Sequence, residues 1–288
     1  MSTIIKLAQG SPDWLEYRLK MRNASETAAV MGVSPWTTPY QLWLLKTGRA
    51  VTTVTKAMQH GTDTEPAARA AYEEQTGNVM QPLVLQDGAY SASLDGITFD
   101  QDLILEIKCP VRGTRSDLWQ DVSAGAVPEH YCLQVQHQLM VSGAQLAHLW
   151  IFDGQRGLLH EIGRDDAVIE RIKTAWDAFQ VFMDTDTPPP LSDADTVQRG
   201  DLGWAVAAEA FASAKKAADA ADLALTAARD ALVKLAQHPR EQGAGVAVTR
   251  FWKTGSVAYA KIPALQGLDL SQWRGKAREE VRISLAAN

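Results

Sequence analysis

The chain has 288 residues, of which 46% are hydrophobic and 22% charged, the composition of an ordinary soluble globular protein. A formal net charge of −6 argues against a surface that binds nucleic acid everywhere, although a local positive groove is compatible with it. Two cysteines are too few for a disulfide-stapled secreted scaffold. With no signal peptide and no apolar run of about 18 residues, the sequence favours a soluble cytoplasmic protein without a membrane partner.

The first part of the chain predicts a short strand followed by helices. Ser11-Pro12 is typical of a helix start, and this helix should end near residue 21. Further helices are expected over three segments, namely residues 25–31 behind a capping-box pattern, residues 39–47, and residues 65–76 with a start or kink at Pro66.

Short alternating runs replace the helical periodicity after residue 77. Strands are expected over residues 79–85, 89–94, 96–99 and 103–108. If Asp100-Gln101 forms a two-residue turn between the last two strands, Asp95 lies directly opposite Glu106. Gly96, next to Asp95, would admit the close approach of a ligand.

The last of these strands, LEIKCP, carries an acid and a base. Glu106 and Lys108 project from one face, while Leu105 and Ile107 enter the other. If Glu106 and Asp95 face each other, their Cβ atoms lie about 4.5–5.5 Å apart, and the two carboxylates repel unless a cation lies between them. Mg²⁺ or Mn²⁺ would resolve this conflict, and the lysine could orient or deprotonate a water or neutralise charge on phosphorus. The alternative is a solvated strand face.

The following segment predicts two helices, a hairpin and an amphipathic helix. The two helices are expected over residues 116–123 and 128–141. The hairpin is expected over residues 147–152 with 157–162, and the amphipathic helix over residues 168–182. The triple proline at residues 188–190 then marks a domain boundary, with a core of residues 1–187 and an extension of residues 188–288.

The extension is rich in alanine, with 15 alanines between residues 205 and 237. This predicts a helix of roughly 50 Å or a helical hairpin. A β-hairpin is expected from residues 246–252 and 256–259, before a basic end that contains Arg274, Lys276, Arg278 and Arg282. Oligomer contact, partner docking and a grip on DNA all suit such a segment.

Four motifs follow one another along the core, namely PDWLEYRLKMRNASETAAVMG, HGTDTEPAARAAYEEQTG, SLDGI with LEIKCP, and HYCLQVQHQLMVSG. In this order they resemble the phage λ exonuclease and YqaJ-type viral recombinase family of PD-(D/E)xK nucleases, over about residues 9–183. The resemblance implies an α/β fold with a PD-(D/E)xK (restriction-endonuclease-like) core, whose central mixed sheet is flanked by helices. A C-terminal helical and hairpin extension would follow this core.

The resemblance also implies site residues. The catalytic residues would be Lys108, Glu106, Asp95, Glu65 and Gln134. The ligands of two Mg²⁺ or Mn²⁺ ions would be Asp95, Glu106 and the carbonyl of Ile107. The residues in contact with the 5′-phosphate of DNA would be Arg18, Ser25 and Tyr131. Without the resemblance, Arg18 could be a surface arginine and Ser25 a routine helix cap. Glu65 could be a glutamate that complements a helix dipole, and Tyr131 and Gln134 could be polar groups on a helix surface.

By the same resemblance, the protein is expected to be a metal-dependent 5′→3′ exonuclease. It would digest linear double-stranded DNA and leave 3′ single-stranded overhangs for phage-type recombination with a single-strand annealing protein. A homotrimeric ring and a phage or prophage origin in a bacterial cell belong to this expectation. The alternatives are a non-catalytic DNA-end-binding recombination scaffold or another PD-(D/E)xK nuclease. Two cysteines cannot hold the Fe–S cluster that some of the latter carry.

Overall fold

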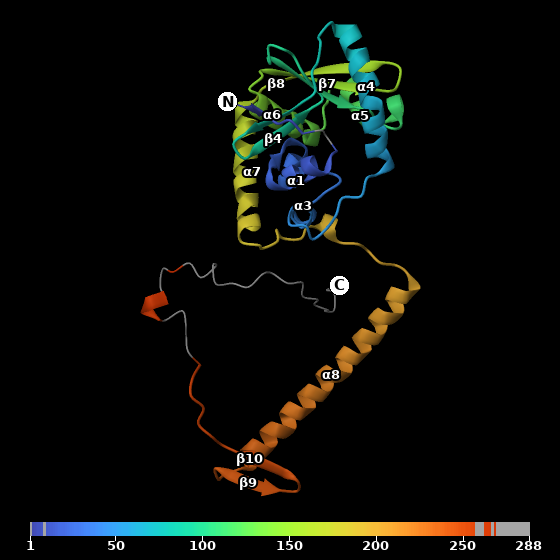
Figure 1. Ribbon diagram of the computed structural model, residues 1–288. Coiled ribbons are helices and arrows are strands. Elements are labelled where there is room, and N and C mark those ends of the chain that lie inside the picture. The colour runs from blue at the N-terminus through green and yellow to red at the C-terminus, as the bar shows by residue number, and fades with distance from the viewer. Residues whose placement is uncertain (1, 8–9, 257–261, 266–267, 269–288) are drawn as a thin grey trace. The chain divides into compact units, whose positions relative to one another are not determined.

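The computed structural model describes residues 2–7, 10–256, 262–265 and 268, and the chain divides into two compact units, Met1–Thr196 (unit 1) and Val197–Asn288 (unit 2). Figure 1 shows both units. The predicted boundary at residues 187–188 falls after the last α-helix of unit 1. The assignment of the two parts as a nuclease core and an extension stays a prediction.

Unit 1 is built from short strands and helices, with 3₁₀ turns denoted η. In chain order its elements are β1 (Thr3–Ile4), α1 (Pro12–Lys20), β2 (Arg22–Asn23), η1 (Ala24–Glu26), α2 (Thr27–Val30), α3 (Pro39–Lys46), α4 (Lys56–Thr76), β3 (Leu83–Asp87), β4 (Tyr90–Leu94), β5 (Gly96–Ile97), β6 (Leu103–Lys108), η2 (Gly113–Arg115), α5 (Asp117–Ser123), α6 (Glu129–Ser142), β7 (Leu146–Phe152), β8 (Gly157–Gly163), α7 (Asp166–Asp184) and η3 (Asp193–Asp195).

Capping residues set the helix starts much as the sequence predicts. Ser11 accepts a hydrogen bond from the N–H of Trp14 at the start of α1, and Thr38 forms a capping box at the start of α3. The helix expected over residues 25–31 is instead the 3₁₀ turn η1 followed by the four-residue α2. Asn23 does not cap it with a side-chain acceptor; its amide donates to Glu26 Oε2 at 2.9 Å.

Helix α4 begins at Lys56, nine residues before the predicted helix, where the Thr55 side chain caps it. Pro66 lies inside this helix, so the helix start expected there is wrong. Proline lacks an N–H and leaves one helical carbonyl without its usual donor, but the helix continues on both sides because its buried residues, Ala68 and Tyr72, hold it to the core.

The strands form two mixed four-stranded sheets, in the orders β1-β3-β4-β2 and β5-β6-β7-β8. In the first sheet β2 runs parallel to β4, and in the second β6 runs parallel to β7; the other neighbours are antiparallel. The single central sheet of the prediction is therefore divided. The division falls at Asp95, the one residue between β4 and β5. Two backbone hydrogen bonds between Gln81 and Ile97, of 2.9 and 3.0 Å, join the sheets beside it.

The hairpin of β5 and β6 has the predicted register, with Gly96 opposite Leu105 and Ile97 opposite Ile104. Its turn is wider than predicted: the N–H of Thr98 donates to the carbonyl of Leu103, and the loop covers residues 99–102. The wider loop is centred on the same two residues as the predicted turn, so the register is unchanged.

Gly96 serves the packing of this hairpin. A Cβ atom on Gly96 would lie 2.6 Å from the Cβ of Met80 and 3.2 Å from the Cβ of Leu105. Because these two side chains fill the space that the glycine leaves, Gly96 lets the strands pack closely and does not provide room for a ligand, contrary to the prediction.

Helix α6 is held on two sides. Its Val135 and Leu139 belong to a core cluster with residues of β3, β4 and β7, and its Leu133 packs with Trp176 of α7. In Figure 1 α4 and α7 lie on opposite sides of unit 1, with the strands and α6 between them. The packing leaves one stripe of α6 facing β6, where Gln134 and Gln138 lie.

Unit 2 contains α8 (Leu202–Leu235), β9 (Arg240–Gly243), β10 (Val246–Thr249) and the 3₁₀ turn η5 (Pro263–Leu265). Of the two predicted forms, the structure has the single helix, which is about 51 Å long at 1.5 Å per residue. No described helix has both the length and the apolar character needed to cross a membrane.

The first strand of the predicted C-terminal hairpin is shorter than expected and ends at Thr249, and its pairing with residues 256–259 stays a prediction. Residues 246–249 pair with the preceding strand β9 through a turn at Ala244-Gly245, whose φ angles are 48° and 79°. Positive φ at both positions is typical of a type I′ turn, which the glycine permits. Most of the predicted partner strand, residues 257–259, lies outside the described residues, as do the four cations of the basic end.

Candidate active site

Strand β6 places Glu106 and Lys108 on one face, as predicted. Glu106 is only 2% exposed, so its carboxylate needs partners to replace water. Lys108 Nζ forms an ion pair with Oε1. Gln134 Nε2 donates to the same oxygen at 2.6 Å, and Gln138 Nε2 donates to Oε2 at 2.5 Å. Both carboxylate oxygens are therefore bound, which accounts for a buried acid in an apolar strand.

The Lys108 ammonium is held in its charged form. Burial alone would lower the pKa of Lys108, but attraction to the charges of Glu106 and Asp95 outweighs burial and raises the pKa. Nζ also donates to Gln134 Oε1 at 3.4 Å and lies 5.2 Å from the ring centre of Tyr131. Of the three roles expected for this lysine, a charged ammonium suits orienting a water or neutralising charge on phosphorus better than deprotonating a water.

Asp95 reaches the same place from the break between the two sheets. Its Oδ2 accepts a hydrogen bond of 2.7 Å from the backbone N–H of Ile107, and its carbonyl accepts one of 2.7 Å from Arg69 Nε. Burial first, and then the negative charges of Glu106 and Glu65, raise the pKa of Asp95 well above its ordinary value. The structure therefore brings together the two acids that the register predicts to be neighbours.

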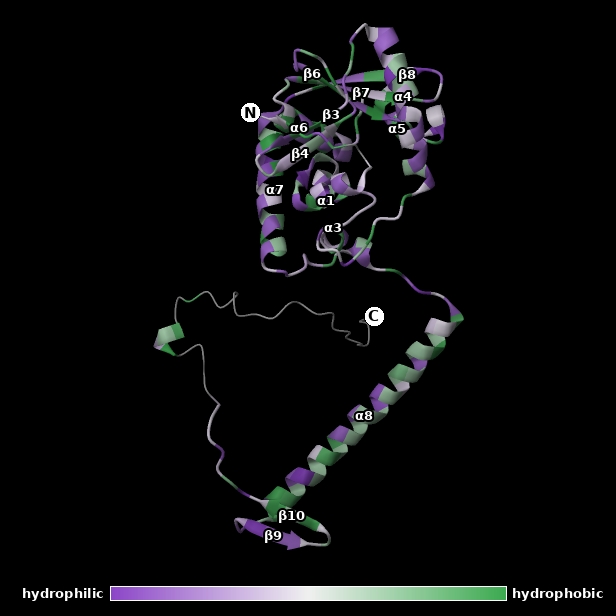
Figure 2. Cartoon of the chain, viewed as in Figure 1, coloured by the Kyte–Doolittle hydropathy of each residue, from purple (hydrophilic) through white to green (hydrophobic). Residues whose placement is uncertain are grey.

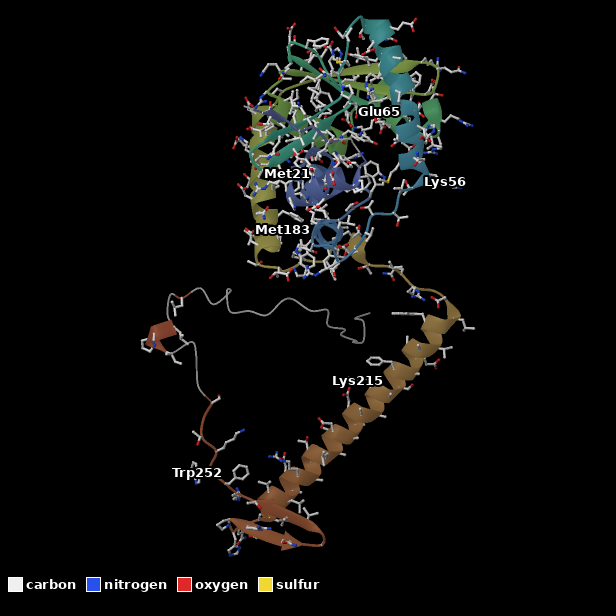
Figure 3. The ribbon with its side chains drawn as sticks, viewed as in Figure 1. Met21, Lys56, Glu65, Met183, Lys215 and Trp252 are labelled. Carbon is white, nitrogen blue, oxygen red and sulfur yellow. The ribbon has the colours of Figure 1, made fainter. Side chains whose placement is uncertain are left out.

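Glu65 adds a third carboxylate from α4, which Figure 3 shows alongside the strands with Glu65 labelled. Burial raises the pKa of Glu65, although its ion pair with Arg69 opposes the shift. The charge of Glu106 acts on Glu65 as well, so the three acids are within electrostatic reach of one another. We call Glu65, Arg69, Asp95, Glu106 and Lys108 the acid–lysine cluster.

The donor set of this cluster suits a hard divalent cation. Burial, and then repulsion between its carboxylates, raise the pKa of Asp95, and carboxylate and carbonyl oxygens are the ligands that Mg²⁺ and Mn²⁺ prefer. In the conformation described, the Lys108 ammonium contacts Oε1 of Glu106, one of the candidate ligands. Across the described residues, no three His, Cys, Asp or Glu side chains converge closely enough to hold a metal ion as they stand.

A second charged group lies on α1, η1 and α3. Arg18 Nη2 donates to Ser25 Oγ at 2.8 Å and is 3.4 Å from Glu26 Oε1. The buried Lys46 Nζ contacts the other oxygen, Oε2, at 2.8 Å. The guanidinium carbon of Arg18 lies 4.7 Å from the ring centre of Trp14. One carboxylate thus faces two cations, and we call Arg18, Ser25, Glu26 and Lys46 the arginine cluster.

Ser25 is placed differently from the prediction. It lies within the turn η1 and not at the head of a helix, so the helix N-terminus expected to favour an anion there is not formed. Its hydroxyl instead accepts the hydrogen bond from Arg18. Ala24 of the same turn packs with Val135 and Leu139, which links the arginine cluster to α6.

Tyr131 belongs to the neighbourhood of Lys108. Its ring centre lies 4.2 Å from that of His130 and 6.0 Å from that of Trp36, and the rings of Trp36 and His130 meet edge to face at 4.9 Å. Trp36 is 67% exposed. Among the described residues, Tyr131 makes no hydrogen bond or ring contact with Arg18 or Ser25. Arg18 and Ser25 are thus in direct contact with each other, whereas the contacts of Tyr131 are with Lys108, His130 and Trp36; their role at a 5′-phosphate stays a prediction.

Sequence reasoning missed two charged residues of these clusters, Arg69 and Lys46. Helical periodicity had already placed Gln138 on the face of α6 that carries Tyr131 and Gln134. Arg69 stands four positions after Glu65, a spacing that favours an ion pair on a helix and was a usable signal. Lys46 has no such signal, because its partner Glu26 is distant in sequence and meets it only in the folded chain.

The sequence and fold match known proteins in this region. Residues 13–145 match the YqaJ-like viral recombinase domain. The chain is 28% identical over 170 residues to the uncharacterized protein YqaJ of Bacillus subtilis (strain 168). This match covers 56% of the chain and 52% of the relative, so the chain spans about half the length of that relative.

Two solved structures are similar to the fold. They are the alkaline exonuclease LHK-Exo from Laribacter hongkongensis, with a TM-score of 0.51, and LHK-Exo in complex with dAMP, with a TM-score of 0.52. Each is 27% identical to the chain and matches 61% of this chain and 94% of its own. The fold is thus an α/β fold similar to that of exonuclease structures. Residues 13–145 thus match the YqaJ-like viral recombinase domain, and the chain is similar in sequence to YqaJ and in fold to alkaline exonucleases.

Proposed function

We propose that the protein is a metal-dependent deoxyribonuclease with a PD-(D/E)xK core, which digests linear double-stranded DNA in the 5′→3′ direction and leaves 3′ single-stranded overhangs. The observation that carries this proposal is the meeting of Asp95, Glu106 and Lys108 at one end of β6. A protein that only binds DNA has no need to bury mutually repelling acids next to a lysine. The family match and the similarity to alkaline exonucleases support the same activity.

The proposed ligands of one or two Mg²⁺ or Mn²⁺ ions are Asp95, Glu106 and the carbonyl of Ile107, with Glu65 as a further acid at the edge. When bound, such ions stabilise the charge on the entering and leaving oxygens of phosphodiester hydrolysis. The glutamines at positions 134 and 138 would keep the Glu106 carboxylate in its orientation, since each donates to one of its oxygens.

Lys108 would act on the reacting phosphate. Its ammonium has three donors, of which Glu106 and Gln134 take two, so the third is available to an attacking water or a phosphate oxygen. Because the pKa of Lys108 is raised, the group stays charged at neutral pH and can offset negative charge that develops on the phosphate.

The arginine cluster would hold the 5′-phosphate of a DNA end. Two cations share the single carboxylate of Glu26, which leaves the cluster with an excess positive charge. Lys46 is buried and fixes Glu26, whereas Arg18 is partly exposed and has donors to offer to phosphate oxygens. Tyr131 and Trp36 would contact the DNA nearer the acid–lysine cluster. A homotrimeric ring and a single-strand annealing partner complete the proposal.

The test uses the purified full-length protein with linear duplex carrying a 5′-phosphate, the same duplex with a 5′-hydroxyl, and a covalently closed circle, each with Mg²⁺ and with EDTA. We expect mononucleotide release from the 5′-phosphorylated duplex only with Mg²⁺, slower digestion of the 5′-hydroxyl duplex, and an intact circle. Strand-specific end labels report the direction of digestion.

Three results would contradict parts of this proposal. Binding of linear duplex without any cleavage would indicate the DNA-end-binding scaffold. Cleavage of the circle at the rate of the linear duplex would indicate another type of PD-(D/E)xK nuclease. Digestion that begins at 3′ ends would overturn the direction.

A further inference from the structure

Helix α8 presents large apolar side chains that nothing in the helix covers. None of its 34 residues is buried. Leu225 is 67% exposed and Leu235 is 74% exposed, and the indole of Trp204 is also exposed. Figure 2 shows hydrophobic residues along the whole length of α8, interrupted by hydrophilic ones. Most of the stability of a helix in a protein comes from the packing of an apolar face, so we expect the exposed apolar side chains of α8 to pack against a partner.

The apolar residues of α8 follow a heptad repeat. Ten positions, spaced alternately by three and four residues, are all apolar: Trp204, Ala207, Phe211, Ala214, Ala218, Ala221, Leu225, Ala228, Leu232 and Leu235. All charged residues of α8 lie outside these positions. An unbroken repeat of a and d positions over more than four heptads is typical of a coiled coil, in which side chains of one helix insert between those of another.

We propose that α8 pairs antiparallel with α8 of a second copy of this chain to form a two-stranded coiled coil. Each core layer of such a pair joins an a position of one helix to a d position of the other. With full overlap, Trp204 lies opposite Leu235 of the second copy, and Ala218 lies opposite Ala221.

The sizes of the core residues favour the antiparallel orientation. With full overlap, Phe211 lies opposite Ala228 of the second copy, Leu225 opposite Ala214, and Leu232 opposite Ala207. Each of these three layers, which the two-fold symmetry repeats, combines a large residue with a small one, whereas the Trp204–Leu235 layers are large and the central Ala218–Ala221 layers are small. A parallel pair would have no mixed layer, because it would stack Phe on Phe, Trp on Trp and alanine on alanine throughout.

The charges beside the core favour the same partner. In the antiparallel pair, Lys215 lies opposite Asp222 of the second copy, and the two-fold symmetry repeats this ion pair. On the other side of the core the flanking positions are all alanine, which allows a close approach: Ala210, Ala217, Ala224 and Ala231. A parallel pair would place these alanines opposite the charged residues and form no such ion pair. The helix is therefore complementary to itself, which favours a second copy over an unrelated partner.

The first experiment compares two leucines two positions apart on the full-length protein. Leu225 occupies an a position, whereas Leu223 faces away from the core and is similarly exposed, at 73%. Sedimentation equilibrium should give wild-type protein a mass that is an even multiple of the chain mass. Leu225→Glu should halve this mass, and Leu223→Glu, which makes the same change of charge, should leave it unaltered. Far-UV circular dichroism checks that both variants keep their helix content.

These masses decide the pairing. A monomeric wild-type protein at 100 μM would overturn the proposal, because α8 would then be covered within its own chain or not at all. A Leu225→Glu variant with wild-type mass, or equal losses in both variants, would also overturn it. Trimer formation through unit 1 would leave the test intact, since the halving caused by Leu225→Glu is measured relative to wild type. Nuclease activity does not enter these measurements.

The second experiment tests the orientation by disulfide formation. In the antiparallel pair, position 207 meets position 232 of the second copy, and the two copies of position 207 lie about 38 Å apart at 1.5 Å per residue. Mixed Ala207→Cys and Leu232→Cys chains should therefore form a cross-linked dimer on oxidation, whereas Ala207→Cys alone should not. Wild-type protein, whose Cys109 and Cys132 are free, is the blank. Cross-linking of Ala207→Cys alone would indicate a parallel pair and overturn the antiparallel one.

A charge reversal tests the ion pairs. Lys215→Glu should raise the dissociation constant of the pair on the order of tenfold, and Lys215→Glu with Asp222→Lys should restore it. Lys216→Glu makes the same change outside the interface and should have no effect. Equal effects of the two single changes, or no rescue in the double variant, would show that Lys215 does not face Asp222.

Discussion

The acid–lysine cluster and the arginine cluster differ in the sign of the charge that each leaves unbalanced. The first contains three carboxylates and two cations, and the charges of Glu106 and Glu65 raise the pKa of Asp95. The second contains two cations and one carboxylate. The first therefore favours a bound cation and the second a bound anion. Both clusters adjoin α6, so one helix supports two sites of opposite charge, as the proposed metal-dependent step and the proposed phosphate contact require.

The largest expected effect is that of removing the lysine of the acid–lysine cluster. Lys108→Ala should lower the rate of cleavage by about 10²–10⁴-fold, because the ammonium that acts on the reacting phosphate is lost. Steady-state digestion of 5′-phosphorylated duplex with Mg²⁺ measures this rate. DNA binding in a gel-shift assay should remain. Lys173→Ala on α7 is the control, since that lysine pairs with Glu170 on the surface. A Lys108→Ala enzyme with the wild-type rate contradicts the role.

The next effect concerns the arginine cluster. Arg18→Gln should reduce the preference for 5′-phosphate over 5′-hydroxyl ends by about 10–150-fold, the equivalent of a charge-assisted hydrogen bond of roughly 1.5–3 kcal/mol. The ratio of kcat/KM values for the two ends measures it. The rate with 5′-hydroxyl ends should change little.

A matched change keeps the arginine and removes its partner. Ser25→Ala should have the smaller effect of a neutral hydrogen bond, about two- to tenfold. If Arg18→Gln slows both kinds of end equally, the arginine cluster does not recognise the phosphate, and the comparison of the two clusters fails.

Replacing Trp36 tests a contact with the bases of DNA separately from any contact with the reacting phosphate. Trp36→Ala should raise KM for duplex about tenfold with little change in kcat, because stacking on a base contributes roughly 1–3 kcal/mol. The fluorescence of 2-aminopurine near the 5′ end should rise when the indole is removed. Phe99→Ala is the control, since this exposed aromatic lies in the loop at the other end of β6. Equal shifts in KM for the two variants would exclude a specific stacking role.

The smallest effect tests α6, the support that the two clusters share. His137 is fully buried, with Nδ1 2.7 Å from Thr27 Oγ1, and burial lowers the pKa of His137 to about 3. The unfolded chain, with a histidine pKa of about 6.5, takes up the proton first as pH falls. The contribution of the neutral His137 to the free energy of unfolding is therefore fully present above pH 6.5, and it falls by about 1.4 kcal/mol for each pH unit below 6.5.

This dependence is measured by urea unfolding between pH 7 and pH 5. His137→Gln should be less stable at pH 7 but should lose less further stability on acidification than the wild type. His60→Gln, at a partly exposed position of α4, should keep the wild-type slope. Equal slopes for the wild type and His137→Gln would show that this histidine does not contribute to the loss.

The acid–lysine cluster was largely predictable because its geometry is local. Alternation along a strand puts Glu106 and Lys108 on one face, and the hairpin register adds Asp95. The stripe of glutamines on α6 follows from helical periodicity in the same way. The resemblance implied the α/β fold class, but it did not imply the division into two sheets, which falls at the single residue Asp95 between β4 and β5.

The remaining features depend on contacts between distant segments or on signals that were given the wrong weight. Lys46 meets Glu26 only after α3 packs beside η1. Pro66 was expected to start or kink a helix, but tertiary packing of Tyr72 and Ala68 holds a helix that runs through it. In unit 2 the strand β9 was missed, because Arg240–Gly243 lacks the β-branched and aromatic residues that are typical of strands.

The single residue between β4 and β5 gives this fold an uneven tolerance to changes in length. Loop 99–102 can gain a residue without disturbing the paired strands, since only its tip is lengthened. An insertion beside Asp95 would instead turn the next side chain to the opposite face of the strand and carry the carboxyl away from Glu106. Natural variants of this protein should therefore differ in length at the loop and agree in length at the junction.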